Sequence, residues 1–256
     1  MTAGRIRIFG RFLAAIGSVT LFGALSPRAV FSPPWRIGLT LRQMVLDGVR
    51  SLPIVSITAL FTGMVLAFQT AYQINRFGAE IYVGGIVAMS MFRELGPVLT
   101  ALVVAGRVGA GITAELGSMR VTEQIDALES MGVDPYNYLV APRLVAAVLM
   151  MPVLTVYADF IGYFGGFLVG VFKVGLDARQ FIDRTIQIVE PGDILSGLSK
   201  TFVFGAIIAI VGCHMGFKSR GGAQGVGQAT TLSVVVASIL ILIADYFMTS
   251  ILYLFE

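Results

Sequence analysis

Charged residues are scarce in this sequence. Only 13% of its 256 residues are Asp, Glu, Lys or Arg, about half the ~25% that is usual in soluble proteins. Hydrophobic residues make up 56% of the chain, and the mean hydropathy is +0.86. Such a chain has too little polar surface to cover a soluble globule. The composition therefore excludes a soluble enzyme and a disordered tail, and it indicates a protein whose main solvent is the lipid bilayer.

Cysteine and histidine each occur once, as Cys213 and His214. A single cysteine permits no internal disulfide, and a single histidine argues against a histidine-based metal site. The sequence also lacks the GxxxxGKS/T phosphate loop and the HExxH, GxSxG and CxxC motifs, and its glycine-rich stretch 219–227 is expected to be a plain loop. We therefore expect no metal, no cofactor, no catalysis and no hydrolysis of ATP by this chain itself.

Apolar runs of the ~20 residues that a bilayer span requires recur along the chain. Four clear runs cover residues 53–74, 144–171, 194–215 and 232–255. Residues 81–119 are harder to assign, because one helix of that length would measure ~57 Å against a ~30 Å hydrocarbon core. We expect a break at Gly96-Pro97, with a full span from about Pro97 onward and a shorter interfacial or re-entrant helix before it. The predicted fold class is an all-α integral membrane protein with five transmembrane helices.

Basic residues are unevenly distributed among the connections. Seven arginines but only one acid, Asp47, precede the first expected span. Because basic segments tend to stay on the cytoplasmic side, the N-terminus is predicted to be cytoplasmic. With five spans, the C-terminus then emerges on the opposite, periplasmic side.

Residues 1–50 are predicted to form an N-terminal segment separate from the membrane domain of residues 51–256. Within it, residues 12–25 are apolar and follow three arginines. This run is too short to span a bilayer, and it fits either an interfacial amphipathic helix or a signal peptide. We favour the interfacial helix, because cleavage would leave the mature N-terminus outside, against the distribution of arginine.

A short amphipathic helix is predicted at about residues 121–132, on the cytoplasmic side between the second and third spans. Val121, Ile125 and Leu128 share one face of such a helix. Thr122 is expected to cap its start and Gly132 to end it. The acids on its other faces make an anionic membrane surface a poor neighbour. A protein partner that offers a groove is therefore favoured over a solvated connector.

Ionisable residues also occur at membrane depth, where each costs about 2.5–3.5 kcal/mol at a helix centre. They are Arg93, Glu94, Asp159, Lys200 and Asp245. Such groups face a bundle interior or a wet cavity and are candidates for function. We expect Lys200 to join Arg93 and Glu94 in a polar cluster that suits a lipid with a phosphate headgroup. The alternative for these three residues is an interhelical salt bridge that only fixes packing. For Asp159 and Asp245, a salt bridge that fixes helix packing is the favoured interpretation.

The central part of the chain carries a nearly unbroken signature. It consists of RELGPV at 93–98, AGRVGA at 105–110, AELGSMRVTEQIDAL at 114–128, MGVDP at 131–135 and APR at 141–143. This pattern resembles the MlaE/YrbE permease family, the membrane subunits of MCE-type lipid ABC transporters. The similarity covers about residues 40–255 and is most specific over residues 93–143, whereas the first 35 residues match only in character.

The resemblance implies a homodimer in the bacterial inner membrane. This dimer would dock on a cytoplasmic ABC ATPase subunit through a coupling helix at residues 122–131, and on a hexameric MCE-domain protein in the periplasm. Its substrate would be a phospholipid or a related hydrophobic lipid moved between inner and outer membranes, with no nucleic acid involved. Arg93, Glu94 and Lys200 match family positions near the lipid cavity. The residues implied in coupling to the ATPase are Glu123, Gln124, Ile125, Asp126, Leu128 and Glu129.

A stand-alone secondary carrier is the alternative. In it, Asp159, Asp245 and Glu94 would act as proton or ion relays within the membrane. We find no internal repeat across the spans of the kind that many such carriers contain, and this favours the transporter subunit.

Overall fold

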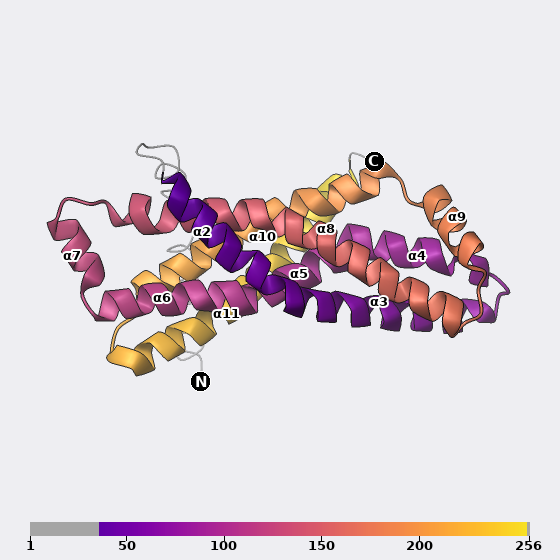
Figure 1. The fold of residues 1–256 in the computed structure, drawn as a ribbon, viewed down its shortest axis with the longest axis horizontal. Coiled ribbons are helices and arrows are strands. Elements are labelled where there is room, and N and C mark those ends of the chain that lie inside the picture. Colours follow the sequence, from indigo (N-terminus) through magenta and orange to yellow (C-terminus); the bar gives the residue numbers. More distant parts are fainter. Residues whose placement is uncertain (1–35, 255–256) are drawn as a thin grey trace, which may run out of the picture.

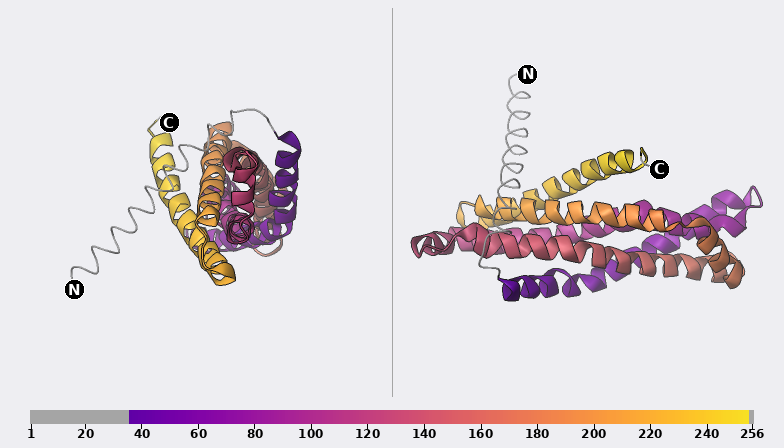
Figure 2. Two further views of the ribbon diagram at one scale, coloured as in Figure 1. Left: turned by 90° about the vertical axis from the view of Figure 1, so that its left-hand side faces the viewer. Right: turned by 90° about the horizontal axis from the view of Figure 1, so that it is seen from above.

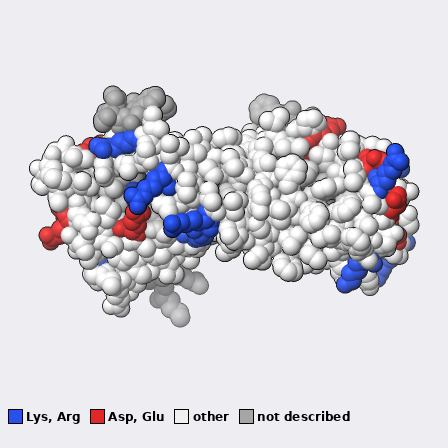
Figure 3. All heavy atoms as spheres, viewed as in Figure 1, with Lys and Arg blue, Asp and Glu red and all other residues white. Residues whose placement is uncertain are grey.

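The computed structural model describes residues 36–254, and this part of the chain is built of helices without strands. Five helical stretches are long and apolar enough to cross a membrane: Ile37–Asn75, Glu80–Val121, Tyr136–Phe172, Pro191–Phe217 and Gly222–Leu252. They run along one long axis (Figure 1). On the face shown in Figure 3, charged residues gather at the two ends and leave an uncharged belt between them, as a bilayer requires. The prediction of five spans in an all-α protein is confirmed.

The first stretch contains a bend. Helix α2 (Ile37–Asp47) is followed by the 3₁₀ turn η1 (Val49–Ser51) and by helix α3 (Leu52–Asn75). Helix α3 agrees within one residue with the expected span 53–74. The predicted interfacial helix at residues 12–25 lies outside the described part of the chain.

The second stretch is one continuous helical rod, and the expected break at Gly96-Pro97 is wrong. Its 42 residues comprise η2 (Glu80–Tyr82), α4 (Val83–Ser90), η3 (Met91–Leu95), α5 (Gly96–Val104), η4 (Ala105–Gly109) and α6 (Ala110–Val121). Segments η3 and η4 are π-helical turns. The wider turn η3 precedes Pro97, so the proline falls at the start of α5, where a missing N–H is tolerated. At 1.5 Å per residue the rod measures ~60 Å and extends beyond the hydrocarbon core.

Two short helices occupy opposite ends of the bundle (Figure 1). Helix α7 (Gln124–Ser130) connects the second and third stretches at one end, and α9 (Ala178–Ile188) connects the third and fourth at the other. The sequence analysis did not predict α9, whose inward face consists of Phe181 and Thr185. The next connection is shorter than expected, because the last helix already begins at Gly222, inside the stretch 219–227.

The long helices α8 (Ala141–Phe172) and α3 pack closely, and glycine permits this approach. A Cβ atom added to Gly63 would lie 1.8 Å from the carbonyl oxygen of Gly162. Small residues are the usual means by which membrane helices come this close. The π-helical turn η5 (Tyr136–Val140) leads into α8, and α10 (Pro191–Phe217) packs on its other side.

Helix α11 (Gly222–Leu252) contributes much less to the interior. Only Ser233, Ala237 and Ile241 of this helix are buried. In Figure 2 the yellow helix diverges from the remaining bundle toward the C-terminus. About half of its apolar side chains are exposed, as expected for a helix that faces lipid or another protein chain.

Candidate functional site: a charged cluster between three membrane helices

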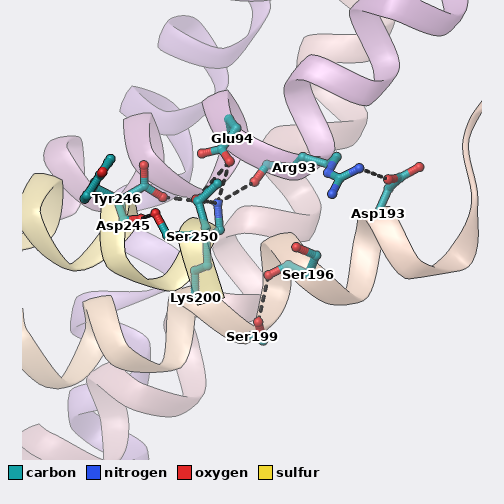
Figure 4. A network of polar contacts seen from close by, with 10 residues as sticks. Arg93, Glu94, Asp193, Ser196, Ser199, Lys200, Asp245, Tyr246 and Ser250 are labelled. Atoms are coloured by element: carbon teal, nitrogen blue, oxygen red, sulfur yellow. Dashed lines mark hydrogen bonds and ion pairs between the residues drawn. The ribbon is translucent and has the colours of Figure 1, made fainter. Parts of the chain in front are cut away.

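A buried lysine is the centre of the site. Lys200 lies on α10, and its side chain is 1% exposed. Its ammonium nitrogen is 2.7 Å from Glu94 Oε1, 3.2 Å from Asp245 Oδ1 and 2.6 Å from Thr249 Oγ1 (Figure 4). Glu94 belongs to η3, and Asp245 and Thr249 belong to α11. The cluster therefore joins three of the five membrane-spanning stretches through one side chain.

A backbone carbonyl is the fourth partner of Lys200. The ammonium group donates to the carbonyl oxygen of Arg93 at 3.1 Å. In a regular helix this carbonyl would accept from the N–H of residue 97, and Pro97 has none. Lys200 thus contacts the backbone of η3 as well as its Glu94 side chain. With three N–H donors facing four acceptors, the ammonium group is fully engaged by the protein.

Arg93 points to a different partner. Its guanidinium is 3.0 Å from Asp193 Oδ1, with both side chains largely buried, and it lies over the ring of Tyr253, 4.8 Å from the ring centroid. The other oxygen of Asp193 accepts the backbone N–H of Glu190 at 2.9 Å in the capping box of α10. Asp193 therefore fixes both the start of α10 and the position of Arg93.

Glu94 is the accessible member of the cluster. Its side chain is 38% exposed, whereas that of Asp245 is 19% exposed. Thr249 donates to Glu94 Oε1 at 3.0 Å, so this oxygen accepts two hydrogen bonds. The Glu94 carboxylate is therefore fixed in place by hydrogen bonds and lies at the surface of a buried network of positive and negative side chains.

The structure brings together the three predicted residues and adds three that the sequence analysis missed. Asp193 and Thr249 share helix faces with known members, since Asp193 precedes Lys200 by seven residues and Thr249 follows Asp245 by four. These spacings could have identified them. Tyr253 carried no comparable signal.

The two intramembrane aspartates behave differently. Asp245 forms the interhelical ion pair expected of it. Asp159 does not: within residues 36–254 no ion pair is found for it, and its Oδ1 has no hydrogen-bond partner. The expectation of a salt bridge at Asp159 is therefore wrong, because Arg93 and Lys200, the basic residues of the neighbouring η3 and α10, are paired with Asp193 and Glu94.

Helix α7 presents acidic side chains at the end of the bundle. Ile125 is buried and Leu128 is half-buried, whereas Glu123, Gln124, Asp126 and Glu129 are exposed. Its N-cap residue is Glu123 in a left-handed conformation (φ 60°), so the expected capping by Thr122 is wrong. The ending at Gly132, with φ 75°, agrees with the prediction. Arg120 of α6 pairs with Asp126 and ties α7 to the preceding helix.

A second ion pair connects the helices on either side of α7. Arg143 on α8 is buried and lies 2.8 Å from Glu115 on α6. Nearby, Arg107 donates to Ser51 Oγ at 2.7 Å and so fixes η1 against the second stretch. The sequence analysis assigned no contact to these residues.

Comparisons with known proteins agree with this architecture. The family model described as "Permease MlaE" matches residues 40–251. A probable ABC transporter permease protein of Rickettsia prowazekii is 46% identical, over 95% of this chain and 94% of its own. The intermembrane phospholipid transport system permease protein MlaE of Haemophilus influenzae is 40% identical, over 94% of this chain and 93% of its own. The chloroplastic protein TRIGALACTOSYLDIACYLGLYCEROL 1 of Arabidopsis thaliana is 39% identical, over 82% of this chain and 60% of its own.

The family match covers far more than half of the chain, including the whole charged cluster except Tyr253. It also includes every described helix apart from the first residues of α2 and the last of α11. The relatives align over nearly the same length. The chain therefore belongs to the MlaE permease family of ABC transporter permeases.

Proposed function

We propose that this protein is the membrane subunit of an ABC transporter that moves phospholipid, or a related hydrophobic lipid, between the inner and outer membranes. It has no motor of its own, and a separate cytoplasmic ATPase supplies the energy. The observation that carries this proposal is the charged cluster at membrane depth, whose burial would be too costly to keep without a role.

The cluster suits the headgroup of an amphiphile. A phospholipid headgroup carries charge, and its chains need an apolar wall. Glu94 is the accessible carboxylate, and Arg93 is held nearby by Asp193. Lys200 makes four contacts within the protein, so its role is to hold Glu94 and α11 in place. Glu94 offers the lipid its exposed carboxylate, and Arg93, which is 12% exposed in its pair with Asp193, contributes its positive charge to the site.

Helix α7 is proposed to dock on the ATPase. Its buried Ile125 anchors it to the bundle, and its exposed acids supply a polar surface for a partner. The ion pair Arg120–Asp126 connects α7 with α6, and the ion pair Arg143–Glu115 connects α6 with α8. A displacement of α7 is thereby passed to α6 and α8 and on to the bundle.

The remaining assembly follows from the family resemblance. We propose a homodimer in the bacterial inner membrane, with α7 and the N-terminus on the cytoplasmic side and the C-terminus in the periplasm. A hexameric MCE-domain protein is the expected periplasmic partner. The exposed apolar surface of α11 is compatible with contact to a second copy or to lipid.

Lipid transport by the assembled complex tests the headgroup site. Arg93→Gln and Glu94→Gln should lower transport at least tenfold while the complex still assembles. Asp193→Asn is the matched variant, because it removes the partner of Arg93 but keeps the arginine. Arg179→Gln, on an exposed residue of α9, is the control for loss of a positive charge. Wild-type transport by both Arg93→Gln and Glu94→Gln would exclude them from the site.

Co-purification of the ATPase tests the docking of α7. Glu129→Lys reverses an exposed charge. Asp126→Lys also removes the pair with Arg120, and Glu123→Lys changes the N-cap residue. All three should reduce recovery of the ATPase. Asp183→Lys reverses an exposed acid on α9 at the other end and should leave recovery unchanged. A stoichiometric complex with all three α7 variants would rule out this docking surface.

A further inference from the structure

Asp159 is an acid in the middle of the bundle to which the proposed function gives no task. It lies on α8, is 5% exposed, and its Oδ1 has no hydrogen-bond partner among the described residues. We propose that Asp159 is a buried proton-binding site: it holds a proton in this arrangement of helices and releases it only when α8 separates from the second stretch at Gly96. This proposal rests on the packing of the bundle and does not require the lipid-transport function.

No compensating charge is available to an ionised Asp159. Helices α3, α4 and α5, which pack against α8, contain no charged residue. The charged residues of η3 and of the facing half of α10 are already paired, Arg93 with Asp193 and Glu94 with Lys200. The remaining charged groups on the elements packed against α8 lie toward the two ends, on α2, α9 and α8 itself; they are Arg42, Asp47, Arg143, Arg179, Asp183 and Arg184, together with His214.

Little room for water lies on the Oδ1 side of Asp159. A Cβ atom added to Gly96 would lie 1.7 Å from Asp159 Oδ1, so this oxygen rests directly against the backbone of the second stretch. A cavity beside Gly96, also bordered by Thr58, Thr100 and Ala158, has a volume of about 10 Å³. This is about the minimum for one water molecule, and one water does not hydrate a carboxylate.

If the Asp159 carboxyl group is protonated and neutral, no unpaired charge is buried in the bundle. An unpaired ionised carboxylate in an apolar interior is so unfavourable that the group takes up a proton instead. Thr155, one turn earlier on the same face of α8, is also buried with an unpartnered hydroxyl. Two uncharged polar groups then face α5 side by side, at a cost far below that of one charge.

The position of Gly96 connects the protonation of Asp159 with the position of the charged cluster. Gly96 directly follows η3, the π-helical turn that carries Arg93 and Glu94. Separating α8 from Gly96 would admit water to Asp159 and would also displace the turn that holds the charged cluster. Proton release at Asp159 is therefore linked to the same helix movement that would rearrange the cluster.

Infrared spectroscopy of the purified full-length chain in lipid nanodiscs tests the protonation directly. With aspartate labelled with ¹³C at the side-chain carboxyl, the wild type at pH 7 should show the carbonyl band of a protonated acid, shifted by the label. In the isosteric variant Asp159→Asn, this band should lose the intensity that Asp159 contributes. Absence of the band in the wild type at pH 7, or its persistence at full intensity in Asp159→Asn, would overturn the proposal.

Thermal unfolding at several pH values supplies a readout of a different kind. Unfolding exposes Asp159 to water and releases its proton, so the wild-type unfolding temperature should fall as the pH rises from 5 to 8. Asp159→Asn has no proton to release and should show a smaller fall. Parallel pH profiles for the two proteins would mean that Asp159 is already ionised in the folded state, and would refute the proposal.

Discussion

Helices α8 and α11 are nearly equal in length, at 32 and 31 residues, yet they are used in different ways. Sixteen residues of α8 are buried, and four of them are glycines that let other helices approach. Three residues of α11 are buried. Helix α8 is packed closely on several sides, whereas α11 packs through a narrow stripe against α10 and α6 and is also tied to α10 by the contacts of Lys200 with Asp245 and Thr249. Helices of similar hydropathy are therefore attached in two ways, one by close packing alone and one by packing together with a few charges.

Loss of Lys200 should produce the largest change in how firmly α11 is attached to the bundle. Lys200→Met leaves Glu94 and Asp245 without their cation, and breaking a buried pair in this way costs about 3–5 kcal/mol. We expect a marked fall in thermal stability together with greater protease access to the second half of α11. Adding Glu94→Gln and Asp245→Leu to Lys200→Met should recover much of the loss, because no unpaired charge remains. Wild-type stability of Lys200→Met alone would contradict the role given to the lysine.

The close approach of α3 to α8 should be the next most sensitive feature. Gly63→Ala places a methyl group against the carbonyl of Gly162 and forces the helices apart, with an expected loss of about 1–3 kcal/mol. Gly106→Ala is the matched control, since a Cβ atom there meets nothing within 4 Å. Unfolding temperatures of the two variants in detergent measure the difference. Equal temperatures would mean that α8 is no more shape-dependent than the rest of the bundle.

The exposed face of α11 should respond least. Leu242→Ala and Phe247→Ala remove apolar groups that are 51% and 59% exposed. Since lipid can fill the space that they leave, stability should change by less than about 0.5 kcal/mol. Cross-linking and unfolding of the purified protein measure this. A loss above 1 kcal/mol would show that this face packs against a further protein chain, and α11 would then be held by shape after all.

The sequence by itself determined the class of the protein and most of its outline. The apolar runs place three of the spans within three residues of α3, α8 and α10, because a bilayer imposes length and composition on any helix that crosses it. The last helix begins at Gly222, ten residues before its expected start. The charged residues at membrane depth predicted a polar cluster, because an unpaired charge in the membrane interior is energetically unfavourable. Gly132 predicted the end of α7, because few other residues readily adopt a left-handed backbone conformation.

Tertiary structure alone decided how these pieces meet. The rod Glu80–Val121 stays continuous through Pro97 because a π-helical turn precedes the proline, and Lys200, 103 residues later, contacts the backbone of that turn. Arg93 and Glu94 are neighbours in sequence but pair with different helices. Asp159 and Asp245 look alike in sequence, yet one lies against a glycine and the other beside a lysine. Local pattern fixes which groups enter the membrane, whereas contacts between distant helices fix which of them are neutralised there.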